Sequence, residues 1–262
     1  MKDFSFDISR SRPPHVLSAV LGADSFFYGL FDSEHQLYSC TYHEDFDYSD
    51  ASIEALAAEL NRYKGVPQKL AISTKPFLHV PAGQASITDY YPAYDDKLVQ
   101  SEPLSGSDTL VLYGLNARQQ KVVDDSMDSP EMHHISKVLH AGLVSPSNSD
   151  TVNLSLYIDA DVAHYTATGP QGLLLYNQFY CANKTDYLYH TILVYKALGL
   201  STSEHALQLL GRVEQESDIY ELLHDYIQDI DFVADDQLSI SDMQHKGSKH
   251  VYQDLYSTML CE

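Results

Sequence analysis

Residues 16–42 read VLSAVLGADSFFYGLFDSEHQLYSCTY, and residues 152–179 read VNLSLYIDADVAHYTATGPQGLLLYNQF. Each stretch holds three apolar runs separated by two short polar turns, a pattern that predicts three consecutive β-strands. The first run of each stretch is largely apolar, as expected of a strand that is buried on both faces. The same order of strands and turns is therefore present twice.

Each set of strands is followed by helical and strand patterns. The first set precedes a helix over 51–63 and a strand over 69–73, and the second precedes a helix over 185–198 and a strand over 206–210. A further helix is expected over 217–227. This duplicated β-β-β-α-β-α order predicts the fold of an actin-like ATPase. We expect two ribonuclease-H-like lobes, each a mixed five-stranded sheet with helices.

The polar segment Ser145–Asp150 is the best candidate for a linker. We therefore expect a first lobe over 1–145, with an insertion near 77–105, and a second lobe over 146–262, related by a pseudo-twofold axis. A helix is predicted over 129–142 because Pro130 suits a first helical position. Another is predicted over 250–260, and Asn116 can cap a further helix over 117–124.

Two of these predicted helices carry side chains whose burial or metal binding has to be considered. In the helix over 185–198, Leu188, Ile192 and Tyr195 share one face and are expected to be buried. In the helix over 129–142, His133 and His134 lack the i, i+4 spacing of a helical metal pair, so no metal site is predicted. A solvated or capping role is expected for these histidines.

Charge limits the partners of the chain. It has 262 residues, with 37 acidic and 16 basic side chains and a formal net charge of -21. Such a field repels phosphate backbones, and no cluster of Lys or Arg offsets it, so neither nucleic acid nor an anionic membrane is an expected partner. The N-terminus lacks the apolar core of a signal peptide, and three widely spaced cysteines suit a reducing compartment. We expect a cytoplasmic protein without membrane insertion.

The runs Leu174–Tyr180, Thr185–Tyr187 and Leu209–Arg212 are similar to one family of uncharacterised bacterial proteins. That resemblance covers nearly the whole chain. It implies the actin-like ATPase fold and a distant similarity to the cytoplasmic assembly proteins of type IV pili and type II secretion. It assigns no chemistry to the chain.

In active members of the wider superfamily, one Asp-x-Gly hairpin from each lobe holds the phosphates and Mg²⁺, and a Gly-Gly pair flanks the adenosine. The resemblance therefore implies cleft positions that could bind a cofactor. They are Asp24 and Ser25 in the first hairpin, Asp159 and Asp161 in the second, and Gly211 and Arg212 after the later strand. No catalytic residue and no metal ligand is assigned.

The chain departs from the pattern at each of these places. Gly22 and Asp24 have exchanged order, Asp161 stands where a glycine belongs, and Gly211 is followed by Arg212. Neither hairpin contains a Lys or Arg. We therefore expect no bound cofactor, although weak MgATP binding stays open. In the simplest interpretation the aspartates are turn residues and Arg212 is a surface charge.

Three classes of function follow. The favoured one is a non-catalytic actin-like protein that binds another protein as a scaffold component; a homodimer also stays open. The second is a weak ATP binder or ATPase that uses the interlobe cleft. The third, by analogy of fold, is a metal-dependent nuclease with Asp24, Asp159 and Asp161 as ligands. An occluded cleft would favour the first class, and an open acidic cleft the others.

Overall fold

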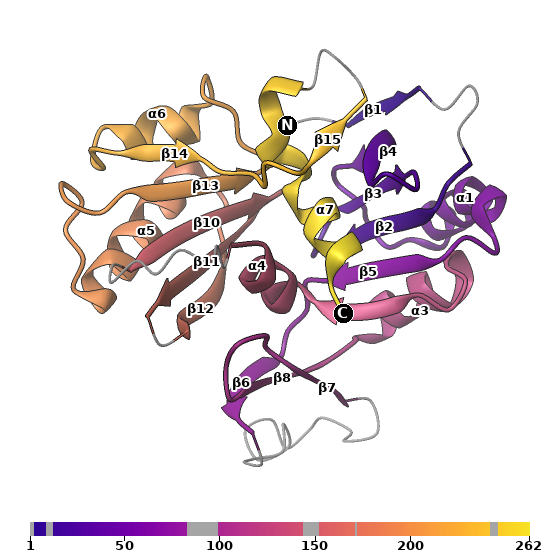
Figure 1. The fold of residues 1–262 in the computed structure, drawn as a ribbon, viewed down its shortest axis with the longest axis horizontal. Coiled ribbons are helices and arrows are strands. Elements are labelled where there is room, and N and C mark those ends of the chain that lie inside the picture. The colour runs from indigo at the N-terminus through magenta and orange to yellow at the C-terminus, as the bar shows by residue number, and fades with distance from the viewer. Residues whose placement is uncertain (1–2, 9–12, 83–98, 144–151, 171, 242–245) are drawn as a thin grey trace.

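The computed structural model of the chain describes residues 3–8, 13–82, 99–143, 152–170, 172–241 and 246–262 (Figure 1). These residues form two large mixed sheets and one small sheet. Figure 1 shows the two large sheets on opposite sides of the molecule, with helices α4 and α7 between them. The linker candidate Ser145–Asp150 lies outside the described residues.

The first large sheet has the strand order β1-β4-β3-β2-β5-β9, and the short strand β15 pairs with β4. Its strands are Phe4–Asp7 (β1), Val16–Leu21 (β2), Phe26–Phe31 (β3), Gln36–His43 (β4), Gln68–Ile72 (β5), Glu131–His134 (β9) and Ser239–Ile240 (β15). Along β2, Leu17, Ala19 and Leu21 belong to one core cluster and Val20 to another. The sheet is therefore buried on both faces, which explains the continuous apolar run at its centre.

Helices cover both faces of this sheet. One core cluster includes side chains of α1 (Asp50–Leu60) and α3 (Ala117–Ser126), and the other includes side chains of α4 (Ile135–Leu143) and α7 (Gln253–Leu260). Short 3₁₀ helices over Asn61–Tyr63 (η1) and Lys246–Tyr252 (η3) extend α1 and precede α7.

The second large sheet has the order β12-β11-β10-β13-β14. Its strands are Asn153–Asp159 (β10), Val162–Gly169 (β11), Gly172–Tyr180 (β12), Leu207–Gly211 (β13) and Ile230–Phe232 (β14). Helices α5 (Lys184–Leu198) and α6 (Asp218–His224) pack on one face. From the other face, Tyr157 and Leu210 join the cluster that contains Phe27 of β3 and Leu255 of α7. The core is thus continuous from one lobe to the other.

A third sheet with the order β6-β8-β7 lies between β5 and α3 in the chain. It consists of Phe77–Pro81 (β6), Val99–Pro103 (β7) and Thr109–Gly114 (β8). Strands β6 and β7 fall within the insertion predicted near 77–105.

The predicted fold class is confirmed: the chain is a mixed α/β protein with two mixed sheets of five or more strands and helices. The lobe boundary at residue 145 stays a prediction. The structure adds that β15 and α7, both from the C-terminal half of the chain, pack on the first sheet. Each half of the chain therefore contributes elements to the first lobe.

Two local predictions are wrong. Glu131–His134 begin the predicted helix 129–142 but form β9, because they pair in parallel register with Lys69–Ile72 of β5. In α5 the buried residues are Tyr187, Thr191, Val194 and Tyr195, whereas Leu188 and Ile192 are only half-buried. Tyrosine and threonine at the first two of these positions are weak apolar signals, so the sequence pattern put the buried face one residue too late.

Candidate functional site

The two hairpin turns singled out in the sequence meet between the lobes. The Gly22 N–H donates to the Ser25 carbonyl (2.9 Å) after β2, and Ala160 turns the chain after β10 with a φ of 45°. The Ser25 hydroxyl donates a 2.6 Å hydrogen bond to the Asp159 carboxylate. A Cβ on Gly22 would lie 2.5 Å from the same carboxylate oxygen, so glycine allows this close approach.

Asp159 is more than an ordinary turn residue. Its side chain is 3% exposed and also accepts a hydrogen bond from the Tyr42 hydroxyl (3.3 Å). The Nε atom of Arg212 lies 3.5 Å from the carboxylate. Hydroxyl donors of the first lobe and a cation of the second lobe therefore converge on this one carboxylate.

Arg212 is a buried cation, so the interpretation of it as a surface charge is wrong. Its side chain is 2% exposed, and its Nη1 atom lies 2.6 Å from the carboxylate of Asp254 in α7. The guanidinium carbon lies 4.3 Å from the ring centre of Phe27 and 5.1 Å from that of Tyr42. Burial by itself lowers the pKa of Arg212, but attraction by Asp254 and neighbouring groups raises it overall, so the cation stays charged.

This environment could not be read from the local sequence, because its parts come from β3, β4, β10 and α7. Gly211, directly before Arg212, lies at a close contact between β13 and β10. It has a φ of 89°, and a Cβ there would lie 2.2 Å from the Ile158 carbonyl oxygen. The Arg212 N–H donates to that carbonyl (2.7 Å). Gly211 is thus required by the close contact of β13 with β10.

The other two aspartates differ in their environments. Asp24 is half-buried, and its Oδ1 atom has no hydrogen-bond partner within the described part of the chain. Burial, followed by repulsion from Asp159, Asp161 and Asp45, raises the pKa of Asp24 from 3.8 to about 6. Asp161 is exposed. The structure therefore brings Asp24, Ser25, Asp159, Asp161 and Arg212 to one junction, with Gly211 supporting it.

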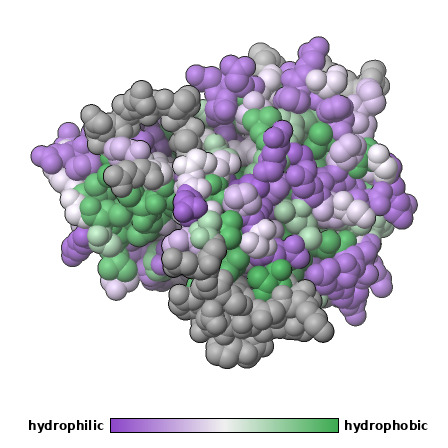
Figure 2. Space-filling model, turned by 60° about the horizontal axis from the view of Figure 1, so that its bottom comes forward, coloured by the Kyte–Doolittle hydropathy of each residue, from purple (hydrophilic) through white to green (hydrophobic). Residues whose placement is uncertain are grey.

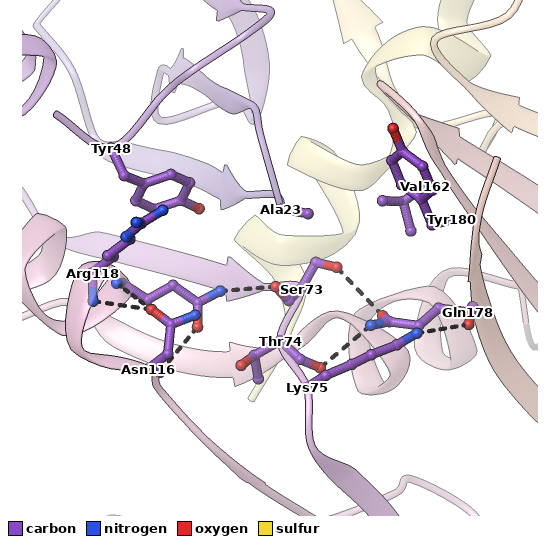
Figure 3. Close-up of a pocket in the computed structure, with 11 residues that line it drawn as sticks. Ala23, Tyr48, Ser73, Thr74, Lys75, Asn116, Arg118, Val162, Gln178 and Tyr180 are labelled. Atoms are coloured by element: carbon purple, nitrogen blue, oxygen red, sulfur yellow. Dashed lines mark hydrogen bonds between the residues drawn. The ribbon is translucent and has the colours of Figure 1, made fainter. Parts of the chain in front are cut away.

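A pocket of about 320 Å³ opens beside this junction (Figure 3). Its lining comes from both lobes: Ala23, Tyr48, Ser73, Thr74, Lys75, Asn116, Arg118 and Gln119 from the first, and Val162, Gln178 and Tyr180 from the second. Figure 3 shows Tyr48 and Arg118 across the pocket from Val162 and Tyr180, with Ser73 and Thr74 between them.

Hydrogen bonds hold the floor of the pocket in place. The Ser73 hydroxyl donates to the Gln178 side chain (3.4 Å), and the Lys75 ammonium donates to the Gln178 main-chain carbonyl (3.1 Å). The Gln119 amide donates to the Ser73 carbonyl (2.9 Å), and the Asn116 side chain caps α3, as predicted. Gln178 of β12 therefore connects the second lobe to the end of β5.

None of the residues that line this pocket was predicted as a site residue from the sequence. Lys75 and Arg118 lie 43 positions apart, on either side of the β6-β8-β7 insertion, and Gln178 is on the other lobe. The predicted strand over 69–73 and the Asn116 cap were available signals, because loops at the ends of buried strands carry many binding residues.

The two neighbouring histidines that were predicted on a helix lie in the core. His133 and His134 are buried on β9, and His133 Nδ1 lies 2.8 Å from the carboxylate of Glu102. The expected solvated role is therefore wrong. Among the described residues, no group of three or more His, Cys, Asp and Glu side chains has the geometry of a metal site.

A family model described as "Protein of unknown function (DUF3822)" matches residues 6–230. The chain belongs to the DUF3822 family. A comparison with the curated proteins gives no match.

Solved structures similar to this DUF3822 chain share its architecture. A Bacteroides thetaiotaomicron VPI-5482 protein with an actin-like ATPase fold and unknown function is 16% identical, with a TM-score of 0.71 over 98% of this chain and 99% of its own. A PilM-PilN type IV pilus biogenesis complex matches at 12% identity and a TM-score of 0.65, over 95% and 98%. The cytoplasmic domain of EpsL, an inner membrane component of the Vibrio cholerae type II secretion system, matches at 12% and 0.51, over 94% of both chains. These similarities establish the actin-like fold.

No helix within the described ranges is both long enough and apolar enough to span a membrane.

Proposed function

We propose that this DUF3822 protein is a non-catalytic actin-like protein that binds another protein as a scaffold component of the cytoplasm. The observation that carries the proposal is the closed junction between the hairpins. Ser25 contacts Asp159 at 2.6 Å, and the Arg212–Asp254 ion pair fills the space behind them. The cleft is thus occluded at the hairpins, as the scaffold hypothesis expects, and the pocket of about 320 Å³ opens only beside them.

Opening this junction for a nucleotide would be unfavourable. A phosphate between the hairpins would replace the Ser25 contact and meet the carboxylates of Asp159 and Asp161. Two unit charges about 4 Å apart repel by about 4 kcal/mol at an effective dielectric constant of 20. That repulsion equals the whole free energy of a millimolar interaction, about 4 kcal/mol.

An exposed hydrophobic surface on the second lobe supports protein binding. It is formed by side chains of β12 and α5, of which Leu174, Tyr189 and Leu193 are between 44% and 64% exposed. Figure 2 shows a broad hydrophobic area on this lobe. Exposed apolar patches commonly mark protein interfaces. Two copies of a chain with a net charge of -21 repel each other, so we propose a different protein as the partner.

The relatives agree with a role in assembly. PilM is found in a complex with PilN, and EpsL is a component of a secretion system. Binding of this chain to another component of an assembly is part of the proposal.

A weak ATP binder or ATPase is the second candidate, because the pocket beside the junction has two cations in its lining, Lys75 and Arg118. The nuclease hypothesis has less support. Of its three aspartates, Asp159 is already engaged by Ser25, Tyr42 and Arg212.

Two measurements test the proposal. Calorimetric titration with MgATP should give no micromolar binding, which would need about 8 kcal/mol; Asp161→Gly is the variant in which binding should improve. Capture from native extract should recover a partner with the unmodified chain but not with Tyr189→Ser/Leu193→Ser. A dissociation constant for MgATP below about 10 μM would favour the ATPase hypothesis instead.

The matched control for capture is Tyr226→Ser. Tyr226 is 57% exposed on the same lobe but lies after α6, outside the surface formed by β12 and α5. Equal loss of the partner in both variants would contradict the assignment of this surface.

A further inference from the structure

The charge of the interlobe pocket is opposite to that of the whole protein. The chain carries 37 acidic and 16 basic side chains, yet the only charged residues among the eleven that line the pocket are Lys75 and Arg118. Within the described ranges, neither residue forms a salt bridge. Two cations without a partner acid beside a hollow are suited to an anionic ligand.

The remaining lining is polar and fixed in position. Ser73, Thr74, Gln119 and Gln178 are each 6% exposed or less, and hydrogen bonds hold them as described above. The ammonium of Lys75 is oriented by the Gln178 carbonyl and retains two further donors. Arg118 is exposed at the start of α3, where its guanidinium offers a planar pair of donors.

The volume restricts the size of the ligand. About 320 Å³ lies at the lower end of the range for small-molecule sites, and it corresponds to about ten water molecules at roughly 30 Å³ each. Asp24 and Asp161 adjoin Ala23 and Val162 at the rim, so a polyphosphate extending toward the hairpins would meet negative charge.

We propose that this pocket binds a small phosphate monoester that carries hydroxyl groups. The Lys75 ammonium beside Gln178 holds the phosphate, and Arg118, on the opposite side of the pocket beside Tyr48 (Figure 3), adds a second positive charge that attracts it. The amide side chains of Asn116 and Gln178 face the hydroxyl groups. The ligand contacts both lobes, because Gln178 and Tyr180 belong to the second lobe and Lys75 and Arg118 to the first. The site goes beyond the proposed scaffold function and does not depend on it.

The test is calorimetric titration of the full chain with inorganic phosphate and with glycerol 3-phosphate, at an ionic strength kept constant with chloride. Saturable binding is expected for both, tighter for the ester than for inorganic phosphate. Acetate and citrate serve as carboxylate probes, and tighter binding of either would overturn the assignment to a phosphate.

Lys75→Gln/Arg118→Gln should weaken binding of the ester at least about tenfold, because it removes both positive charges from the lining of the pocket. Lys184→Gln/Lys196→Gln removes the same charge from the exposed surface of α5 and should leave the affinity unchanged.

Arg118→Glu provides a variant that should fold, because the side chain is exposed and an acid suits the first turn of a helix. It should abolish binding while leaving the unfolding midpoint without ligand nearly unchanged. Absence of saturable binding by both phosphate probes, or equal loss in the α5 control, would overturn the proposal. Tighter binding of MgATP than of the ester would overturn this proposal, and it would overturn the scaffold function as well if the dissociation constant for MgATP lay below about 10 μM. Failure of the ester alone leaves the scaffold function standing.

Discussion

Arg212→Met is the substitution that best tests the closed junction. Methionine retains the unbranched shape of the side chain but removes the cation, so the carboxylates of Asp254 and Asp159 stay in the core without it. Those side chains are 0% and 3% exposed. Removing one partner of a buried ion pair typically costs about 3–5 kcal/mol, because the other charge remains buried and uncompensated. We expect a loss in that range for the free energy of unfolding at pH 7.5.

The loss should depend on pH in a defined direction. Burial raises the pKa of Asp254 even with Arg212 present, and removal of the cation can only raise it further. A carboxyl whose pKa is higher in the folded than in the unfolded state stabilises the folded state increasingly as the pH falls toward its pKa in the unfolded state. The deficit of Arg212→Met should therefore shrink between pH 7.5 and pH about 5. The double variant Arg212→Met/Asp254→Asn should lose less than the sum of its single variants.

Urea unfolding followed by circular dichroism and tyrosine fluorescence measures these differences, since the chain has 20 tyrosines and no tryptophan. The matched control is Lys184→Met, which removes a cation from an ion pair whose members are 49% and 78% exposed. That pair should contribute at most about 1 kcal/mol. A loss for Arg212→Met no larger than the control, with no dependence on pH, would refute the closed junction as a structural core.

Three further predictions concern stability. Asp24→Asn should raise the free energy of unfolding by about 1 kcal/mol at pH 7.5, because the raised pKa of Asp24 means that its charged form is unfavourable in the folded protein. The value is smaller than the full pKa shift would give, since Asp24 is only half-buried. The gain should fade as the pH falls from about 6 to about 4. Gly211→Ala should cost about 3 kcal/mol or more. Gly65→Ala should cost only about 1 kcal/mol, because Gly65 has a similar φ of 82° but no atom of the described residues would lie within 4 Å of its Cβ. Equal losses would contradict the close contact of Gly211 with Ile158. Val194→Ala should cost about 2 kcal/mol and clearly more than Ile192→Ala, as urea midpoints would reveal, because Val194 is buried whereas Ile192 is half-buried.

Hydrophobic periodicity predicted the elements whose environment is set by neighbours in sequence. The three-strand runs after Val16 and Val152 and the helix capped by Asn116 are all present. The prediction of a helix from Pro130 failed at Glu131–His134, because pairing of these residues with β5 outweighs helix propensity. Hydrophobic periodicity misplaced the face of α5, because Tyr187 and Thr191 are amphipathic residues whose burial depends on what packs against them.

The position of the candidate site could be predicted, but the burial and pairing of its charged side chains could not. The resemblance to the actin-like superfamily implies that the two hairpins lie close together, and Ser25 does contact Asp159. Whether a charge in such a place is solvated depends on distant segments. Arg212 is buried because Asp254 arrives from the last helix, 42 residues later in the chain, and no local pattern around Arg212 encodes that contact.

The same residues show how side chains of the protein connect the two lobes of this architecture. In a cleft that holds a ligand, the two lobes depend on that ligand for part of their contact. Here a cation of the second lobe stacks on Phe27 and Tyr42 of the first lobe and pairs with Asp254 of α7, so the lobes are connected by the protein's own side chains. Since the core around Phe27 and Tyr157 is continuous, closure of the lobes contributes to folding itself. A protein closed in this way would present a fixed outer surface, which is the property that the proposed scaffold function requires.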